Sequence, residues 1–412
     1  MILLLQYKAL LQGMKHFYFI VFFCLITFVI NAQDSVNTEE QNLLNLILRG
    51  KDSTVDHVLK NAAKYHFQLI LSIIDTIDGE ENILSFDLNR DKYFFSPASL
   101  IKLPVAIVAA EKLSELKRQY NVGLDDSIQV ELCSCDKNIL SYLKRTSPPT
   151  FRQILRETMI MSSNTGYNFF FNFLGKDDFN ARIRSLGYDR INLRNRFYLP
   201  CNDEEQSLYG GISFLDSNGR RKYKMNCIRS NGTWPNSREW PHEAGIQHKE
   251  NGKWVLGPKD YINSNYVSLW EAHHMLVSLM RSDSSVFRID DEIKKVLTDA
   301  MGSFPRELKS KHYTGSYPDH YYKFFLDPVS MHTSDGSLRI YNKVGIAGGF
   351  ISDVSFFQDK RSGLRFYLSA AMMAKKDGIP DNGKYDYYSI GVPVFRKIGA
   401  MVYAYLSKSI SQ

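Results

Sequence analysis

Segments with the pattern of β-strands lie at both ends of this chain, and helical segments lie between them. The N-terminal pair is "FQLILSIIDT" (67–76) and "NILSFDLNRDKYFF" (82–95), separated by the turn sequence "IDGEE". Three more strands are predicted near the C-terminus, over 338–349, 350–359 and 364–374. The simplest architecture is an α+β fold. It has an antiparallel sheet formed from both termini and flanked by helices, with an all-helical lobe inserted between its strands.

Helical periodicity accounts for much of the remaining chain. Apolar residues recur at helical spacing over 33–66, and an almost wholly apolar helix is predicted over 100–111. Further helices are predicted over 266–282 and 391–410. In contrast, residues 203–263 are polar, with Gly, Asn, Trp and Pro scattered through them, which predicts a long irregular insertion. The predicted lobes are a sheet lobe over 33–98 and 330–412 and a helical lobe over 99–329.

The first 32 residues have the layout of a secretory signal peptide, with a positive flank, a short apolar core and a small residue at the cleavage point. The core is "FYFIVFFCLITFVI" (17–30), cleavage is expected after Ala32, and Met14 is an alternative start. The other interpretation is an uncleaved anchor, although a bilayer span needs about 20 residues. Cys24 does not follow the small residue typical of a lipoprotein, so no lipidation is predicted. We therefore expect a secreted or periplasmic protein whose mature domain is 33–412, with no membrane span after cleavage.

The composition is that of an ordinary globular protein. Hydrophobic residues make up 44% and charged residues 23% of the 412 residues, which argues against a disordered chain. The net charge of +7 comes from basic residues spread along the chain, without a Lys/Arg stripe. We therefore expect no nucleic acid partner.

The cysteines remaining after signal cleavage are Cys133, Cys135, Cys201 and Cys227. An exported chain permits disulfides, and Cys201 with Cys227 is the preferred pair because it closes a polar loop. The "CSC" sequence is tighter than the usual spacing of zinc ligands, and "HEAGIQH" does not place two histidines four residues apart. No metal site and no other cofactor are predicted.

Lys102 is the one lysine at the start of the apolar helix predicted over 100–111. A buried ammonium is costly unless it is paired, hydrogen-bonded or neutral. Ser99 lies three residues earlier, so a helix places both side chains on one face, about one turn apart. A serine hydroxyl needs a base to become a nucleophile, and a partly neutral lysine can serve as that base. The alternative is a lysine that extends from a half-buried helix to solvent.

Two further motifs accompany this pair. Ser162 and Asn164 precede an apolar helix, and Lys343 and Gly345 lie on a predicted strand. The order S-x-x-K, S-x-N, K-x-G is typical of serine β-lactamases and penicillin-binding proteins. The chain resembles the class A β-lactamase family through "FSPASLIKLP", "ETMIMSSNTGYNFFFNFLG" and "KVGIAGGFISDVSFF". The resemblance extends over 34–202 and 264–410.

The resemblance implies acyl transfer through a covalent serine intermediate. Ser99 would be the acylated nucleophile, and Lys102 would be its proton acceptor or relay. Ser162 would pass a proton to the leaving nitrogen. Asn164 would hold both the substrate's amide carbonyl and Lys102. Lys343 would supply positive charge near Ser162 and near the substrate carboxylate.

The resemblance also implies how the strand after the second lobe binds substrate. Gly345 would let the strand backbone approach the substrate, and the backbone N–H groups of Ser99 and Ile346 would form the oxyanion hole. Two positions depart from the family pattern. Val344 replaces a hydroxyl residue that helps bind the substrate carboxylate, and Ser163 replaces an aspartate.

A larger departure lies in the loop "RFYLPCN" (196–202). Class A enzymes carry a glutamate there, which activates the water that releases the acyl group. Asn202 fits the family loop and is expected near the substrate, but Tyr198 stands at the glutamate position. Tyrosine has an ordinary pKa near 10 and is a poor base at neutral pH. Glu204 and Glu205 lie close by and are the alternative bases.

The insertion over 203–263 is longer than the corresponding family loop by roughly 50 residues, which is unusual for a connection without a function. Its position after the deacylation loop would let it cover the site, and "GTWPNSREWPHE" would supply aromatic contacts to a substrate. The alternative is an exposed loop with no role in catalysis.

Three functions fit these residues. The first is a periplasmic class A-like β-lactamase that hydrolyses β-lactam amides and deacylates slowly because of Tyr198. The second is a D,D-peptidase or another acyl-serine hydrolase acting on peptidoglycan peptides or esters, since such enzymes often lack the glutamate. The third is a penicillin-binding sensor that stays acylated. We favour the first, and we expect a monomer that acts on a small β-lactam or peptidoglycan-peptide substrate.

Overall fold

The computed structural model describes residues 43–77, 80–133, 149–199, 201–250, 252–281, 286–331 and 333–410. The chain divides into two compact units, residues 1–47 and residues 48–412. Within the first unit the described residues are 43–47, and they are helical. The predicted signal peptide and Cys135 lie outside the described residues. Across the described ranges, no helix combines the length and the apolar character that a membrane span requires.

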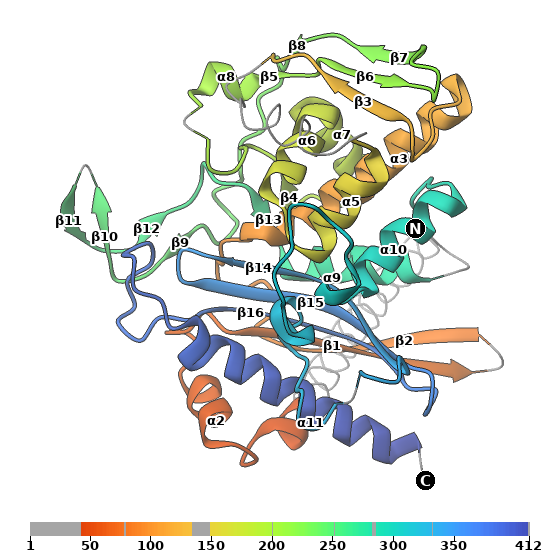
Figure 1. Cartoon of the computed structure of the whole chain (residues 1–412). Helices are drawn as coiled ribbons and strands as arrows, with labels where there is room; N and C mark the ends of the chain where they lie inside the picture. Colours follow the sequence, from red (N-terminus) through yellow and green to blue (C-terminus); the bar gives the residue numbers. More distant parts are fainter. Residues whose placement is uncertain are drawn as a thin grey trace, which may run out of the picture. The chain divides into compact units, whose positions relative to one another are not determined.

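Five antiparallel strands of the second unit form one sheet in the order β14–β15–β16–β1–β2 (Figure 1). Their bounds are β1 (Gln68–Ile77), β2 (Glu80–Leu88), β14 (Leu338–Ala347), β15 (Phe350–Asp359) and β16 (Arg365–Met373). Strand β1 pairs with β16, with Ile70 opposite Ser369, so the sheet joins segments from both ends of the chain. The predicted α+β fold with an antiparallel sheet is confirmed.

Two predicted element boundaries were wrong, in each case because of local backbone conformation. Strand β2 was expected to continue to residue 95 but ends at Leu88, because Asn89 and Asp91 adopt φ values of 57° and 53°. The long N-terminal helix is interrupted at Gly50, which has a φ of 71°. Helix α2 (Ser53–Lys60) starts afresh after Asp52, whose carboxylate accepts hydrogen bonds from two backbone N–H groups of the first turn.

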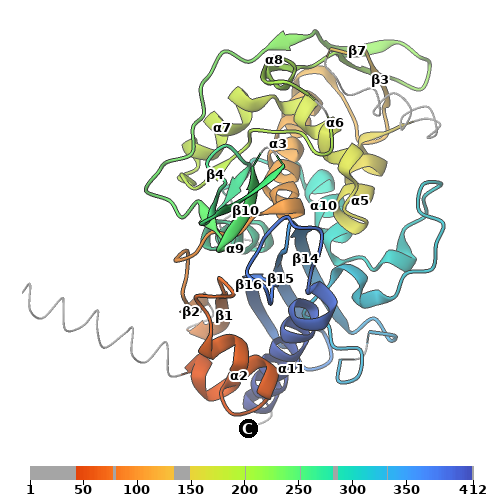
Figure 2. The same ribbon diagram turned by 90° about the vertical axis from the view of Figure 1, so that its left-hand side faces the viewer.

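Helices cover both faces of the sheet. Helix α11 (Val392–Ile410) and helix α2 lie together on one face (Figures 1 and 2). Helix α9 (Leu269–Met280) packs on the opposite face, where its His273 contacts Ser72 of β1 at 2.8 Å and Ser369 of β16 at 2.7 Å. Helix α10 (Asp291–Gly302) packs beside β14. Burial on both faces explains why β16 is a nearly continuous apolar run.

The helical part of the unit is built around α3 (Lys102–Tyr120). It is surrounded by α5 (Phe151–Ile160), α6 (Asn164–Leu174) and α7 (Lys176–Ser185). Most of α3 is buried, and aromatic side chains fill the space beside it. For example, the ring of Phe151 lies 5.2 Å from that of Phe170 and 5.7 Å from that of Phe173. This apolar packing fixes the position of the helix that carries Lys102 at its first residue.

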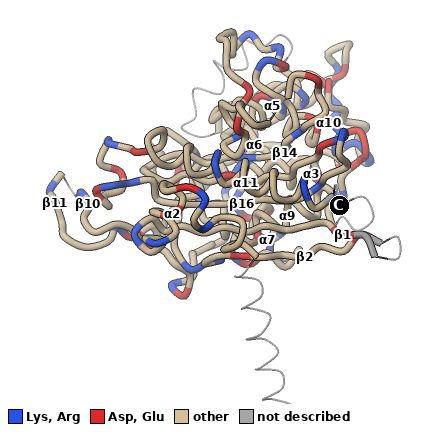
Figure 3. Tube along the Cα trace, turned by 90° about the horizontal axis from the view of Figure 1, so that it is seen from below, with Lys and Arg blue, Asp and Glu red and all other residues tan. Residues whose placement is uncertain are grey.

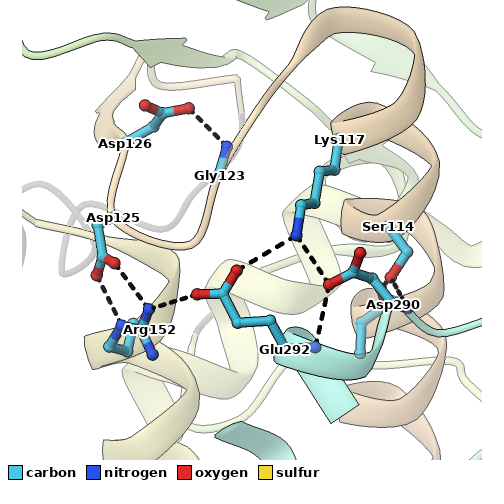
Figure 4. A network of polar contacts seen from close by, with 9 residues as sticks. Ser114, Lys117, Gly123, Asp125, Asp126, Arg152, Asp290 and Glu292 are labelled. Carbon is cyan, nitrogen blue, oxygen red and sulfur yellow. Dashed lines mark hydrogen bonds and ion pairs between the residues drawn. The ribbon is translucent and has the colours of Figure 1, made fainter. Parts of the chain in front are cut away.

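A polar network joins three of these helices at the surface (Figure 4). Lys117 of α3 forms ion pairs with Asp290 at 2.9 Å and with Glu292 of α10 at 3.3 Å. Arg152 of α5 contacts the same Glu292 at 3.1 Å and Asp125 at 2.7 Å. Because these charges are partly exposed, each ion pair alone contributes little to stability. The shared Glu292 nevertheless links α10 to both α3 and α5.

The insertion is more regular than predicted. Strand β6 of the insertion pairs with β3 of the helical lobe and with β7, forming a three-stranded sheet, and the other strands form short two-stranded pairs. Strands of two to five residues carry too few residues for an alternating pattern to be read. The elements of the insertion, together with the strands outside it that pair with them or with one another, have these bounds: β3 (Ser127–Val130), β4 (Ile191–Asn192), α8 (Asp203–Ser207), β5 (Leu208–Tyr209), β6 (Ile212–Leu215), β7 (Arg221–Met225), β8 (Ile228–Arg229), β9 (Glu243–Ala244), β10 (Gln247–Glu250), β11 (Lys253–Leu256), β12 (Lys259–Asp260) and β13 (Tyr266–Val267).

The expected pairing of Cys201 with Cys227 was wrong. Cys227 forms its disulfide with Cys133, and their Cα atoms are 5.6 Å apart. The sheet explains this choice, because β3 ends close to Cys133 and pairs with β6, which pairs with β7 just before Cys227. Cys201 is itself disulfide-bonded.

Short single turns connect the larger elements, and charged residues lie along the connections. The turns are η1 (Ala98–Ile101), η2 (Pro305–Glu307), η3 (Asp319–Tyr322) and η4 (Tyr387–Gly391). In the view of Figure 3, Lys and Arg are interspersed with Asp and Glu along the chain. Many of them are neighbours, as in the ion pair between Arg339 and Glu307 at 2.7 Å.

Candidate active site

Ser99 lies in the tight turn η1, directly before α3. The α-helix was expected to begin at Leu100 and instead begins at Lys102, because the preceding residues form a tighter turn closed by a hydrogen bond from Leu100 N to Pro97 O at 2.8 Å. Ala98 adopts a φ of 45°, which is uncommon for a residue other than glycine. The result is a separation of 2.8 Å between Ser99 Oγ and Lys102 Nζ, as the spacing predicted.

Lys102 is fully buried, so the alternative in which it extends to solvent was wrong. Its Nζ lies 2.7 Å from Asn164 Oδ1, 2.5 Å from the backbone oxygen of Ser162 and 3.2 Å from Ser162 Oγ. All of these partners are uncharged. Burial, and then the charge of Lys343, lower the pKa of Lys102 well below its ordinary value. A lysine whose pKa is lowered in this way is neutral more readily than an ordinary lysine, and it is then able to accept a proton from Ser99.

Ser162 connects Lys102 to Lys343. It lies between α5 and α6 with a φ of 57°, and its Oγ is 2.9 Å from Lys343 Nζ. Its neighbour Ser163 caps α6 by accepting a hydrogen bond from Gly166 N at 3.1 Å. The second motif therefore supplies Ser162 and Asn164 to the site, and Ser163 between them begins the helix.

Lys343 is held from behind by a buried polar network. Burial lowers its pKa to about 7, with Asp353 opposing this effect and Lys323 adding to it. Lys323 donates to Asn342 Oδ1 at 2.9 Å, and Asn342 donates to Asp353 at 2.8 Å. Lys343 therefore carries its charge below about pH 7 and loses it above that value. Neither Lys323 nor Asp353 was singled out from the sequence, because nothing in their local sequences indicates burial.

Gly345 allows a close approach within the protein that the sequence did not indicate. A Cβ at this position would lie 2.2 Å from Pro97 O, 2.7 Å from Ser352 Oγ and 3.2 Å from Leu100 N. The glycine thus allows β14 to pack directly against the turn that carries Ser99. It brings the strand to the nucleophile, and it does not line the pocket described below.

We expect Gly345→Ala to lower the free energy of unfolding by roughly 1–3 kcal/mol and to slow acylation, because the clash is with backbone atoms that cannot move independently. Urea unfolding of the variant measures the first effect. Gly123→Ala is the matched control, since its nearest atom would lie 3.9 Å from the new Cβ. Equal stability of the two variants would contradict the close approach of β14.

A pocket of about 240 Å³ opens in front of Ser99. Its lining residues are Ser96, Pro97, Ala98, Ser99, Asn164, Asn195, Arg196, Phe197, Tyr198, Ser264, Asn265, Ile346 and Ala347. Ile346 lies in the pocket wall, where its predicted oxyanion role places it. Val344 is buried and lies outside this lining. Across the described ranges, no cluster of three or more His, Cys, Asp or Glu side chains is arranged to hold a metal ion.

The deacylation loop contributes no carboxylate to this pocket. Tyr198 lies at the rim, with 80% of its surface exposed and a φ of 54°. Asn202 lies outside the lining, and its side chain caps α8 by accepting a hydrogen bond from Glu205 N at 2.9 Å. The Glu205 carboxylate accepts a hydrogen bond from Asn202 N in the same capping box, and Glu204 pairs with Arg229 at 2.9 Å. Among the described lining residues, none is Asp, Glu or His.

Sequence reasoning missed the asparagines on the far wall of the pocket. Asn265 is buried, accepts hydrogen bonds from the backbone N–H groups of Arg194 and Asn195 at 2.7 and 2.8 Å, and donates to Tyr167 Oη at 3.1 Å. These contacts join Asn265, just after the insertion, to the residues directly before the loop over 196–202. Asparagines in polar stretches are common in loops, so no local signal distinguished them.

The fold and this cluster of side chains are typical of serine hydrolases of the β-lactamase and transpeptidase type. Residues 53–230 match the model of the beta-lactamase enzyme family. The match confirms the resemblance to the class A serine β-lactamase and penicillin-binding protein-like family. No curated protein matches the chain.

Several solved structures are similar to this one. A mutant of PBP-A, in an acyl-enzyme complex with penicillin G, is 14% identical, with 89% of this chain and 97% of that chain covered and a TM-score of 0.50. The extended-spectrum β-lactamase TLA-3 is 14% identical, with 87% and 100% covered and a TM-score of 0.49. A class A β-lactamase from Bacteroides cellulosilyticus is 12% identical, with 90% and 98% covered and a TM-score of 0.48. At such identities, the likeness to PBP-A concerns the fold alone.

Proposed function

We propose that this protein is a class A-like serine hydrolase that opens β-lactam amides through an acyl-serine at Ser99 and releases the acyl group slowly. The observation that supports this most is the continuous set of contacts from Ser99 through Lys102 and Ser162 to Lys343. The N-terminal sequence supports export to the periplasm or beyond the cell, and we propose that the protein acts there as a monomer.

In the acylation step, neutral Lys102 takes the proton from Ser99 Oγ, and the oxygen attacks the lactam carbonyl carbon. The C–O bond forms as the C–N bond breaks. Ser162 Oγ gives its proton to the leaving nitrogen and recovers one from Lys102, which lies 3.2 Å away. Lys343 supplies positive charge for the substrate carboxylate, and the N–H groups of Ser99 and Ile346 receive the developing negative charge on the carbonyl oxygen.

Slow release follows from the absence of Asp, Glu and His among the described residues that line the pocket. Hydrolysis of the ester needs a base to activate water, and such a base contributes about 10²–10⁴ to the rate. The same observation favours a second candidate, a D,D-peptidase or related hydrolase of peptidoglycan peptides. Such an enzyme would transfer or hydrolyse its natural acyl group but would hold a β-lactam as a stable ester.

Intact mass spectrometry after mixing the purified protein with penicillin G tests the proposal. We expect a mass increase equal to the intact penicillin, localised to Ser99, that lasts minutes to hours. Turnover of D-alanyl-D-alanine peptides alongside a stable adduct would favour the peptidase. An adduct that decays within seconds would overturn slow release, and the absence of any adduct would overturn the β-lactam proposal.

Tyr198→Glu tests the cause of slow release. We expect the acyl-enzyme lifetime to shorten by about a hundredfold, at the lower end of the effect of a general base, since the new carboxylate would stand at the rim of the pocket. The decay of the adduct mass measures the lifetime. Tyr198→Gln is the control, because it has the same size as the glutamate without its charge and should leave the lifetime unchanged. An equal lifetime for both variants would show that residue 198 does not reach the ester.

A further inference from the structure

A second cavity, of about 420 Å³, lies beside the active-site pocket and shares Asn195 with it. The two neighbours of Asn195 line different cavities. Arg194 lines the second cavity, and Arg196 lines the active-site pocket. The lining residues are Lys176, Leu193, Arg194, Asn195, Asp203, Gln206, Gly232, Thr233, Trp234, Pro235 and Asn263. The chemistry described above uses none of the residues that belong to this cavity alone.

The insertion builds the outer wall of this cavity. Asp177, in the first turn of α7, accepts hydrogen bonds from Ser230 Oγ at 2.6 Å, from Gly232 N at 3.2 Å and from Trp234 Nε1 at 2.7 Å. A Cβ on Gly232 would lie 2.4 Å from the Asp177 carboxylate, so only glycine permits this contact. This part of the insertion is therefore fixed to the helical lobe, which argues against the alternative of a loop exposed to solvent.

A second anchor fixes the same wall to the loop that reaches the active site. Asn236 donates hydrogen bonds to the backbone oxygens of Ile262 and Ser264 at 2.8 and 2.9 Å, and Ser264 lines the active-site pocket. Asn192 donates to Asn236 Oδ1 at 2.7 Å. The walls of the two cavities are thus parts of one hydrogen-bonded structure, and an occupant of one is positioned relative to the other.

Among the charged residues that line the cavity, Lys176 and Arg194 are basic and Asp203 is acidic. Within the described chain, no hydrogen bond or ion pair joins the ammonium of Lys176. Burial lowers the pKa of Lys176, and the charges of Arg194 and Arg196 lower it further. The charges of Asp177 and Asp203 raise it, but they do not offset the other effects. Arg194 donates to the neutral backbone oxygens of Trp234 and Asn263. An anion in the cavity would relieve this repulsion, and the ammonium would gain a partner.

We propose that this cavity is a substrate subsite that binds a carboxylate carried by a peptide whose scissile bond lies at Ser99. The position beside the active-site pocket argues for an occupant that is part of the same molecule. Amide groups of Asn195, Gln206 and Asn263 suit the polar backbone of a peptide, and Trp234 and Pro235 offer apolar contact. The inference rests on the second candidate of the proposed function, the peptide hydrolase, and deepens it by naming an anionic peptide as the substrate.

Binding to the Ser99→Ala protein tests the subsite without requiring acylation. Two synthetic peptides that end in D-alanyl-D-alanine are compared by calorimetry, one with glutamate and one with glutamine three residues before the end. We expect the glutamate peptide to bind about tenfold more tightly, and Lys176→Gln to remove the difference. Lys253→Gln, an exposed lysine on β11, is the control and should keep it.

Each outcome separates the subsite from the proposed function. Equal binding of the two peptides to the Ser99→Ala protein would overturn the subsite, even if penicillin G still acylates the protein with Ser99 intact. Charge-dependent binding that Lys176→Gln abolishes would support it, even if no β-lactam adduct forms. A preference for glutamate that survives in folded Lys176→Gln, as judged by thermal unfolding, would place the carboxylate elsewhere. Competition by millimolar acetate or phosphate alone would show a general anion site and would overturn the assignment to a peptide.

Discussion

Replacing Ser99 with alanine is expected to abolish covalent labelling by a fluorescent penicillin completely. The side chain lies in the pocket, and its Oγ is 2.8 Å from a buried lysine whose pKa is lowered by burial. Among the described residues that line the pocket, no other hydroxyl lies within hydrogen-bonding distance of a lysine. Ser162 is the nearest alternative, but its Oγ lies against two lysines and outside the pocket lining.

The fold should survive this change. Removing one hydroxyl costs about 1 kcal/mol, and Lys102 keeps its contacts with Asn164 and Ser162. Thermal unfolding checks this point. Ser96→Ala is the matched control, since Ser96 also lines the pocket, and its labelling should match that of the unchanged protein. Labelling that persists in Ser99→Ala would end the assignment of the nucleophile.

The part of the site that could be predicted from the sequence is the part that local geometry and the ordered motifs determine. Ser99 and Lys102 lie together because a single helical turn requires it, whatever the rest of the chain does. Ser162, Asn164 and Lys343 were found because the motif order placed them with this pair, and they meet Lys102 or one another within 3.2 Å. The antiparallel sheet followed in the same way from strand patterns at both ends.

The features that were missed depend on contacts between distant segments. Cys227 pairs with Cys133 because β6 brings two segments 94 residues apart together, and no spacing in the sequence records that pairing. Asn202 matched the family loop by residue type, but its side chain is used to start α8. Gly345 was correctly marked, although the atoms it accommodates belong to the turn around Pro97.

Replacing Lys102 with methionine is expected to slow acylation of Ser99 by about 10²–10⁴-fold, the usual contribution of a general base. Methionine keeps the length and the apolar stem of lysine and leaves Ser99 in place. The rate of adduct formation with penicillin G, followed by mass spectrometry over time, measures the effect. An unchanged rate would exclude Lys102 as the proton acceptor and would leave Lys343, through Ser162, as the remaining basic group in the contact set.

The same variant tests why Lys102 can act as a base at all. Because burial lowers its pKa in the folded state, the unfolded chain binds a proton there at pH values where the folded protein does not. The folded state therefore gains stability as the pH rises toward the ordinary lysine pKa near 10.4, by at most about 1.4 kcal/mol per pH unit. Lys102→Met should lose this contribution, so its free energy of unfolding should rise less between pH 7 and pH 9 than that of the unchanged protein. Parallel curves for the two proteins would mean that Lys102 is charged in the folded state, and Ser99 would then need a different proton acceptor.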